Sequence, residues 1–510
     1  MSSAAIYLDY AATTPVDREV AQAMAECLTA EGDFGNPSST HAYGSAAAAR
    51  VARARTQVAA LIGARPEEIV FTSGATESNN LAILGCARAN ADRGRHLITS
   101  RTEHKSVLDP FHRLEKEGFS VSWLTPAPGG RIDAQAFAAA LRPDTVLAAL
   151  MFANNETGVL EDVAAIGAFC RERHVAFHCD CAQAAGKVPL ALNELPIDFA
   201  AFTAHKLYGP KGIGALYVRG AARPLLQPLT YGGGQERNLR PGTLPTHQIV
   251  GFGAACELAA RKLPEEGPRL QRLRERLWRE LEALGGTHLN GAAAPRLPGI
   301  LNVSFEGVHG ESLIGALTGL AISTGSACSS ESADPSYVLR ALGRNTQLAQ
   351  ASLRFSLGRA TRESEVDSAS AAVREALERL RALSPAGPAG EARRDGRAIA
   401  KDAAGAALVT GEAGGPGQDT WVRFHLLVAG DIVKEARFQA FACPHTTKVA
   451  AQLCEALRGR TRQALIPGSP GGWAREHGVP AEKLGRLLVV ENALRACLAH
   501  WTEALEYEER

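Results

Sequence analysis

The most informative parts of the sequence are Val175-Ala-Phe-His-Cys-Asp180-Cys-Ala-Gln183 and Thr203-Ala-His-Lys206-Leu-Tyr-Gly-Pro-Lys-Gly212. The first has the pattern of a short strand that ends in an acid, and the second places a lysine directly after a histidine. An enzyme that uses pyridoxal phosphate needs such a pair. The lysine amine forms an imine with the cofactor aldehyde, and the carboxylate keeps the pyridine nitrogen protonated. Aspartate and lysine are common residues, so the remaining chain has to support this interpretation.

The overall composition narrows the class of protein. The 510 residues are sufficient for two or three domains, and 45% hydrophobic residues provide ample material for a core. The formal net charge of +1 gives no indication of binding to nucleic acid or to a membrane surface. Ten scattered cysteines, no signal-peptide pattern in the first ten residues and no long apolar run predict a cytoplasmic protein with reduced thiols.

From Ile6 to about Leu383, short apolar strands alternate with amphipathic helices, which favours βαβ units and a mostly parallel sheet. Ligands bind such sheets at the carboxyl ends of the strands. The pattern predicts strands at 68–71, 96–99, 146–152 and 175–178 and helices at 46–61 and 270–284.

The composition changes near Ser384. Glycine, alanine, proline and charged residues dominate 385–418, which is typical of a linker. The chain after it, 419–510, shows two strand-like segments, 421–428 and 432–440, followed by helical periodicity. We expect it to form a separate small α+β domain.

The segment 71–80, Phe-Thr-Ser-Gly-Ala-Thr-Glu-Ser-Asn-Asn, follows an expected strand and opens a helix. Its small residues allow backbone amides to approach a phosphate, and the helix dipole favours the negative charge. The Thr76 hydroxyl can add a hydrogen bond. An ordinary helix cap formed by Ser73 or Thr76 fits the same residues equally well.

Three polar residues are further candidates for a site. His104 follows a strand and is able to stack on a cofactor ring and relay protons, or is simply a hydrogen-bonded histidine at a strand end. Asn155 is able to bond the cofactor's ring oxygen or a substrate carboxylate, or belongs to a turn. Arg354 is suited to binding a substrate carboxylate through its planar fork, with a surface ion pair as the alternative.

Cys328 lies in Ser323-Thr-Gly-Ser-Ala-Cys-Ser-Ser-Glu331, where the neighbours are small and polar. This composition is typical of a mobile loop with a reactive thiol. Cys179 and Cys181 flank Asp180 and are expected to point away from it along the strand. Four other cysteines lie among apolar residues and are expected to pack in the core, namely Cys27, Cys86, Cys170 and Cys256.

Many of these residues belong to motifs that occur in a recognisable order. The motifs are Tyr7-Leu-Asp-Tyr-Ala-Ala-Thr-Thr-Pro15, Gly35-Asn-Pro-Ser38, Gly74-Ala-Thr-Glu77, His104, Asn154-Asn-Glu156, Asp180 to Gln183, His205-Lys206, Gly232-Gly-Gly234, Arg240-Pro-Gly-Thr-Leu-Pro245, Gly325-Ser-Ala-Cys328 and Arg354-Phe-Ser-Leu-Gly358. With these motifs the chain from about Tyr7 to Leu383 resembles the NifS/IscS-type cysteine desulfurases, which are fold-type I pyridoxal phosphate enzymes related to class V aminotransferases. Thr203 and Pro241 stand where serine is usual, and both departures are mild.

The resemblance implies a large cofactor-binding domain over 1–262, whose N-terminal segment packs on a small domain over 263–384 that carries the Cys328 loop. Lys206 would form the Schiff base and Asp180 would pair with the pyridinium nitrogen. The other cofactor-binding residues that it implies are His104 on the ring, Asn155 and Gln183 at its oxygen, and Ala75, Thr76, Thr203 and His205 at the phosphate. Thr243 would reach the phosphate of a neighbouring subunit, which implies a homodimer.

The implied reaction converts L-cysteine to L-alanine. Arg354 and Asn155 would bind the substrate, while Lys206 and His104 would move protons. Cys328 would take the sulfur as a persulfide and pass it to acceptors such as an iron–sulfur scaffold, for cluster assembly or tRNA thiolation. The persulfide would also make Cys328 a transient iron–sulfur ligand. Direct binding of nucleic acid or membrane is not expected.

The chain after Asp419 resembles the IscU-like iron–sulfur scaffolds more weakly, through Ile432-Val-Lys-Glu-Ala-Arg-Phe-Gln-Ala-Phe-Ala-Cys443 and Lys483 to Ala496. Of the cluster ligands of that family, this sequence keeps Cys443 and an aspartate, Asp419. Gly417 replaces the first cysteine, and Gly485-Arg486 replace a His-Cys pair. Since one thiolate cannot hold a cluster, the resemblance implies a degenerate scaffold for docking, regulation or sulfur transfer at Cys443.

Two alternatives stay open at this point. One is another fold-type I enzyme, such as an aminotransferase or a selenocysteine lyase. The other is an inactive chain that serves as an interaction platform. Cys328 argues against transamination, which needs no thiol, and the combination of Lys206, Asp180 and Cys328 argues against an inactive chain.

Overall fold

The computed structural model describes residues 5–292, 294–308, 310–317, 319–324, 335–383, 406–415, 420–480 and 483–506. The chain divides into two compact units, of which the first contains most residues up to 371 and the second contains 372–510 together with two short segments, 307–318 and 331–333. Within the described residues, every helix is too short or too polar to cross a lipid bilayer.

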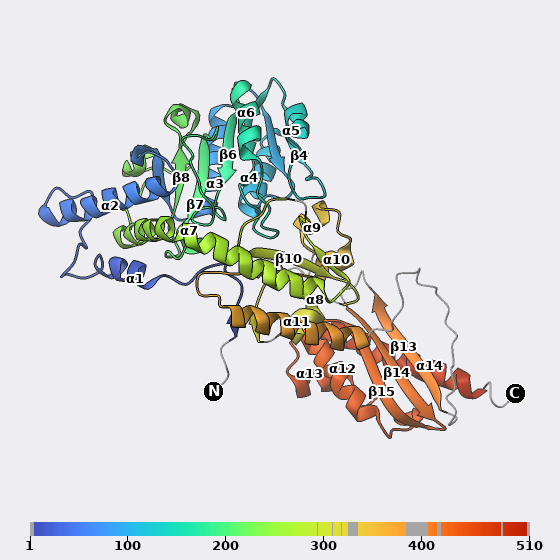
Figure 1. Ribbon diagram of the computed structural model, residues 1–510. Coiled ribbons are helices and arrows are strands. Elements are labelled where there is room, and N and C mark those ends of the chain that lie inside the picture. Colours follow the sequence, from blue (N-terminus) through green and yellow to red (C-terminus); the bar gives the residue numbers. More distant parts are fainter. Residues whose placement is uncertain are drawn as a thin grey trace. The chain divides into compact units, whose positions relative to one another are not determined.

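A seven-stranded sheet forms the centre of the first unit (Figure 1). In spatial order its strands are β2 (Ile69–Thr72), β8 (Gly214–Val218), β7 (Phe199–Thr203), β6 (Ala176–Asp180), β5 (Thr145–Ala149), β3 (His96–Ser100) and β4 (Ser120–Leu124). Strand β8 is antiparallel to both neighbours, and all other pairings are parallel. The expectation of a mostly parallel sheet is confirmed.

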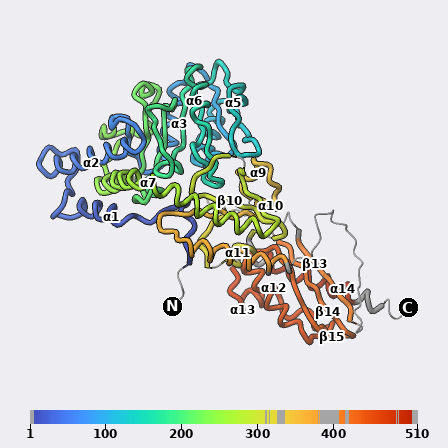
Figure 2. The backbone as a smooth tube through the Cα atoms, viewed as in Figure 1, coloured from blue at the N-terminus to red at the C-terminus, as the bar shows by residue number. Residues whose placement is uncertain are grey.

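Helices cover this sheet, since its inner strands are buried on both faces. Their bounds are α1 (Arg18–Ala25), α2 (Ala42–Leu61), α3 (Ala75–Ala89), α4 (Lys105–Lys116), α5 (Ala134–Ala140), α6 (Val163–Glu172) and α7 (Thr246–Glu282), with single 3-10 turns at Pro66–Glu68, Ala204–Lys206, Gly220–Leu225 and Gln235–Asn238. Helix α3 packs across β5 to β8, and α7 packs against α1 and α2. The trace in Figure 2 shows α7 as one long helix, so the domain boundary expected at residue 262 falls inside it.

Around the seven-stranded sheet, apolar side chains form two clusters, with Phe71, Phe177 and Phe202 in one and Phe111 and Phe199 in the other. The cysteines expected to serve packing are buried, and Cys179 and Cys181 also lie in the core. The prediction that these thiols act as small apolar side chains is confirmed.

A smaller part of the first unit follows α7. Its antiparallel sheet contains β9 (Thr287–Leu289), β10 (Ile300–Phe305) and β12 (Ser352–Ser356). The N-terminal strand β1 (Ile6–Tyr7) pairs with β11 (Leu320–Ala321), and Asp9 forms a bridge with Ser356. The helices of this smaller part are α9 (Tyr337–Ala341), α10 (Thr346–Gln350) and the first half of α11 (Glu363–Leu383). The second half of α11 and α8 (Gly310–Ala316) belong to the second unit.

The second unit contains a three-stranded antiparallel meander, β13 (Ala407–Gly415), β14 (Thr420–Ala429) and β15 (Ile432–Phe441). The helices α12 (Pro444–Leu457) and α14 (Leu484–Glu506) pack on it, and α13 (Pro470–His477) contacts both helices. A single 3-10 turn covers Arg462–Ala464. In β14 alternate residues are buried, so Val422, Phe424 and Leu426 face a core that also contains Trp501.

The extent of the linker predicted at 385–418 is wrong, because β13 occupies 407–415. The physical reason is visible at Gly411. A Cβ atom there would lie 2.2 Å from the backbone nitrogen of Cys497, so α14 crosses this strand too closely for any larger residue. Small residues that suggested a linker are thus required by a buried contact between a helix and a strand.

Candidate active site

A cavity of about 500 Å³ lies at the carboxyl ends of β6 and β7 and at the N-terminus of α3. This is the position at which parallel sheets bind ligands. The sequence-predicted residues that line it are Ala75, Thr76, His104, Asn155, Asp180, Gln183, Thr203, His205 and Lys206. Residues more than 100 positions apart in the sequence therefore meet in one place.

The Asp180 side chain is buried and held by two donors. The backbone N–H of Ala182 donates to Oδ1 at 2.9 Å, and the amide of Asn79 donates to Oδ2 at 2.8 Å. Donors on both oxygens fix the direction of the carboxyl group. The same Asn79 amide accepts a hydrogen bond from His178 Nε2 at 2.8 Å. A buried network of polar side chains therefore holds the carboxylate in place.

His104 caps helix α4 and belongs to the same network. Its Nδ1 lies 2.8 Å from Ser106 Oγ and accepts the backbone N–H of Ser106 at 3.1 Å. Ser106 Oγ also accepts a hydrogen bond from Asn79. Since Nδ1 is an acceptor, the neutral ring carries its proton on Nε2. Burial lowers the pKa of His104, which favours this neutral form at physiological pH.

The start of α3 provides backbone donors without a competing cap. Gly74 is the N-cap residue and has no side chain, and among the described residues no side-chain capping hydrogen bond is formed there. The alternative in which Ser73 or Thr76 caps the helix is therefore wrong. The first N–H groups of a helix have no partner within the helix and attract anions. Beside them, burial and the charges of Lys206 and Lys211 lower the pKa of His205 to about 4, which is consistent with a concentration of positive charge.

Tyr208 fixes the loop that carries Lys206. Lys206 ends the 3-10 turn that directly follows β7, and Tyr208 has a φ of +67°, in the left-handed region. The backbone N–H of Tyr208 donates to Thr14 Oγ1 at 2.8 Å. Its ring centroid lies 4.0 Å from the guanidinium carbon of Arg359. The backbone next to the lysine is thus held from two sides.

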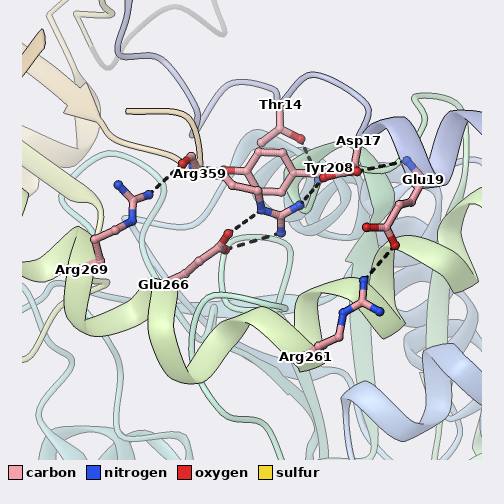
Figure 3. A network of polar contacts seen from close by, with 8 residues as sticks. All are labelled: Thr14, Asp17, Glu19, Tyr208, Arg261, Glu266, Arg269 and Arg359. Atoms are coloured by element: carbon pink, nitrogen blue, oxygen red, sulfur yellow. Dashed lines mark hydrogen bonds and ion pairs between the residues drawn. The ribbon is translucent and has the colours of Figure 1, made fainter. Parts of the chain in front are cut away.

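Arg359 connects this loop with three other segments (Figure 3). Its guanidinium group pairs with Asp17 at 2.8 Å and with Glu266 of α7, and both acids are largely buried. Arg269 donates to backbone carbonyls at residues 358, 359 and 361. The N-terminal segment, the loop of Lys206, α7 and the loop after β12 are therefore joined in one network.

Arg354 lies on β12 and is only 4% exposed. Its Nη1 donates to the backbone carbonyl of Asn155 at 2.9 Å, and its Nη2 pairs with Asp9 at 2.9 Å. The alternative of a surface ion pair is wrong. Arg354 is not among the lining residues and touches them through Asn155. Within the described part of the chain, Arg354 Nε and Asn155 Oδ1 are buried without a hydrogen-bond partner, so both remain available to a ligand.

Besides Arg354, two predicted site residues are not found among those that line the cavity. Thr243 is exposed in the segment before α7 and does not line it. Within one chain it therefore does not contact a ligand there, and its contact with a second subunit stays a prediction. Cys328 lies outside the described residues, and its assignment as the reactive thiol also stays a prediction.

The structure adds residues that sequence reasoning missed, namely Asn79, Ser106, His178 and Lys187. Of these residues, only His178 could have been found from the sequence. It lies two positions before Asp180 in a buried strand and therefore faces the same side of the sheet as Asp180. A buried histidine on that face indicates a polar network. Asn79 and Ser106 lie on helices, where their pairing depends on how α3 and α4 pack together.

The residues of the cavity fit pyridoxal phosphate. The backbone amides at the start of α3 suit its phosphate, the held carboxylate of Asp180 suits its pyridine nitrogen, and Lys206 supplies the amine. The unpartnered amide oxygen of Asn155 adds an unused polar atom at the wall.

Comparison with known proteins agrees with this site. A family model described as aminotransferase class-V matches residues 6–368. The match covers more than half of the chain, so the chain belongs to the class-V aminotransferase family.

The most similar relatives specify the branch of the family. The chain is 54% identical over 381 residues to the cysteine desulfurase IscS of Pectobacterium atrosepticum and likewise 54% identical to that of Haemophilus influenzae, with 74% of this chain and 94% of each relative covered. The chain therefore belongs to the IscS-type cysteine desulfurases, which use pyridoxal phosphate.

Solved structures show the same fold. A NifS-like protein superposes with a TM-score of 0.68 at 34% identity and covers 73% of this chain and 99% of its own. SspA, solved in complex with cysteine, gives a TM-score of 0.62 at 39% identity, with 69% of this chain and 98% of SspA covered. These matches confirm the fold-type I architecture for the first unit.

Proposed function

We propose that the chain is a cysteine desulfurase that converts L-cysteine to L-alanine and holds the sulfur as a persulfide on Cys328. The observation that carries the proposal is the cavity in which Lys206 and the held carboxylate of Asp180 meet. The kinship to IscS enzymes supports the choice of substrate over those of aminotransferases. An assay with selenocysteine in place of cysteine tests the alternative of a selenocysteine lyase.

When bound, pyridoxal phosphate supplies an electron sink for the bond broken at the substrate's Cα. Lys206 Nζ is the base that takes the Cα proton, and the loop held by Tyr208 and Arg359 keeps it in place. Arg354 binds the substrate carboxylate, with Asp9 and the carbonyl of Asn155 orienting its guanidinium group. The neutral ring of His104 covers the cofactor and moves protons through Nε2.

Further residues hold the cofactor. The backbone at Ala75 and Thr76 and the side chains of Thr203 and His205 bind the phosphate. Gln183 and Asn155 face the ring oxygen.

The sulfur step belongs to Cys328. Its thiolate attacks the substrate sulfur, so that an S–S bond forms while the Cβ–S bond of the substrate breaks. The electron pair of the broken bond stays with the carbon skeleton, which takes up a proton and leaves as alanine. The thiolate regenerates when an acceptor thiolate removes the outer sulfur.

Changing Cys328 to alanine is expected to abolish persulfide formation and to leave the visible colour of the bound cofactor intact, because the thiol serves sulfur transfer and not cofactor binding. Mass spectrometry of the protein after incubation with cysteine locates the added sulfur. In the unchanged chain we expect it on Cys328 and, if the second unit accepts sulfur, also on Cys443. Full sulfur transfer by the Cys328→Ala variant would refute the assignment.

A second copy of the chain is expected to complete the site. Large apolar side chains are exposed on the first unit, among them Leu28, Phe34, Tyr43 and Tyr231, the last of which is 83% exposed. Phe34 and Tyr43 contact each other, with ring centroids 5.4 Å apart, and an exposed pair of aromatic rings is suited to an interface. We propose a homodimer in which Thr243 reaches the phosphate of the partner subunit. The persulfide on Cys328 passes its sulfur to acceptors in the cytoplasm, such as an iron–sulfur scaffold or a tRNA-thiolating protein. The same persulfide is a transient cluster ligand.

For the second unit we propose a degenerate scaffold of the IscU type that docks partners, regulates the enzyme or accepts sulfur. Cys443 lies at the N-terminus of α12 and is nearly buried, with Thr446 Oγ1 3.2 Å from its sulfur. Burial raises the pKa of this thiol, but hydrogen bonds with Thr446 and the charge of Arg486 outweigh it, and the net shift is downward. A lowered pKa favours the thiolate, the form that receives sulfur.

The second unit is expected to bind no iron–sulfur cluster. Within the described ranges, no three His, Cys, Asp or Glu side chains are grouped to hold a metal. We expect the full chain carrying Cys328→Ala, incubated with iron and sulfide and then desalted, to retain less than one iron per ten molecules, about the background of adventitious binding. Measuring iron content avoids interference from the cofactor's colour. Stoichiometric iron that Cys443→Ala removes would contradict the degenerate scaffold.

A further inference from the structure

Lys187 is a partly buried lysine that has no role in the proposed reaction. It ends the turn that follows β6, where Gly186 has a φ of +69° and a Cβ atom would lie 3.0 Å from Ala259. This left-handed residue turns the chain back toward the cavity wall. The ammonium group of Lys187 then donates to Gln183 Oε1 at 2.7 Å.

The orientation of the Gln183 side-chain amide is determined by its hydrogen-bond partners. Its oxygen accepts from Lys187, and its Nε2 donates one hydrogen to the carbonyl of Ala11 at 2.9 Å. A primary amide has two N–H groups and one oxygen. One N–H and one lone pair of the oxygen therefore remain, on a buried residue that lines the cavity. Because the oxygen is already directed at Lys187, the N–H is the group left to face a ligand.

A lysine is an unexpected residue for this position. Burial and the positive charges of Lys206 and Arg354 lower its pKa to about 7. Within the described part of the chain, its hydrogen-bond partner is the amide oxygen of Gln183 and not a carboxylate. Both the charged and the neutral amine donate hydrogen bonds, and the contact with Gln183 therefore persists in either state.

We propose that Lys187 is a positioning residue that holds the amide of Gln183 with an N–H, and not the oxygen, toward the cofactor. The inference rests on the proposed function, in which Gln183 faces the ring oxygen. Without Lys187 only the hydrogen bond to the carbonyl of Ala11 still orients the amide, and an amide that turned over would point its oxygen at the oxygen of the cofactor. An amide donor withdraws negative charge from that oxygen, which otherwise helps to retain the proton on the nitrogen that joins Lys206 to the cofactor.

The test is the pH midpoint of the visible absorption of the holoenzyme. Lys187→Met removes the donor and keeps the length of the side chain. Loss of the N–H toward the ring oxygen is expected to raise the midpoint by about one pH unit, a tenfold change in proton affinity. Lys187→Leu provides a second apolar replacement if the first does not fold, as judged by circular dichroism and thermal melting.

A double-mutant cycle separates positioning from charge, because removal of a positive charge near Lys206 also raises the midpoint. In a Gln183→Leu background, Lys187→Met is expected to shift the pH midpoint by less than about one third of the shift that it causes when Gln183 is present. An equal shift in both backgrounds, or no shift in either, overturns the inference. If the unchanged protein itself shows no visible absorption with pyridoxal phosphate, the proposed function fails instead.

Discussion

Replacing Lys206 with alanine is expected to lower alanine production from L-cysteine by roughly 10³-fold or more, since the variant loses both the covalent attachment of the cofactor and the base for the Cα proton. Borohydride treatment of the unchanged holoenzyme should attach the cofactor irreversibly, and peptide mass spectrometry should locate it on Lys206. The alanine variant should take up the cofactor more weakly and carry no such label.

The matched control is Lys206→Arg, which keeps a positive charge in the cavity but offers no amine for an imine. It should be as inactive as the alanine variant while retaining more of the affinity for the phosphate. If either variant kept more than about one tenth of the activity, Lys206 would not be the attachment point, and the interpretation of the cavity would have to change.

Changing Asp180 to asparagine is expected to be the second most damaging substitution, with a loss of roughly 10³-fold in kcat. The asparagine side chain has nearly the same shape, but it has no charge to keep the pyridine nitrogen protonated, so the cofactor loses most of its capacity to accept electrons. The hydrogen bonds from Asn79 and Ala182 now fix a carboxylate. An amide would leave one of these donors opposed by another donor. Steady-state alanine release measures the loss.

Asp198→Asn provides the control for this experiment. Asp198 directly precedes β7 and accepts the backbone N–H of Phe177 in β6 at 2.9 Å, but it does not line the cavity. Its replacement should change thermal stability and leave kcat nearly unchanged. Equal loss of activity in both variants would show that kcat depends on the integrity of the sheet and not on the charge at Asp180.

The sequence was sufficient to predict the architecture where periodicity is strong. The expected strands near 68–71, 96–99 and 175–178 correspond to β2, β3 and β6, because continuous apolar runs of this length are buried on both faces of a parallel sheet. Strand β13 was missed since its small residues are set by contact with α14, a partner some eighty positions away. Local composition does not report such a contact.

For the site, the sequence identified residues that carry recognisable chemistry at strand ends. Asp180, Lys206 and His104 could be named because their types and positions match what the cofactor needs. Their supports could not, since Asn79 reaches Asp180 only through the packing of α3, and Lys187 reaches Gln183 only because Gly186 reverses the chain. Arg354 was correctly singled out, but its pairing with Asp9 joins positions 345 residues apart.

That distance along the chain has a consequence for biosynthesis. Asp9 and Asp17 leave the ribosome among the first residues, whereas their partners Arg354 and Arg359 emerge after nearly all of the first unit has been made. The nascent polypeptide therefore cannot form these two ion pairs until synthesis has passed residue 359. The segment around Asp9 and Asp17 has to wait for partners that are made much later, so its final attachment is a late step in the folding of the first unit.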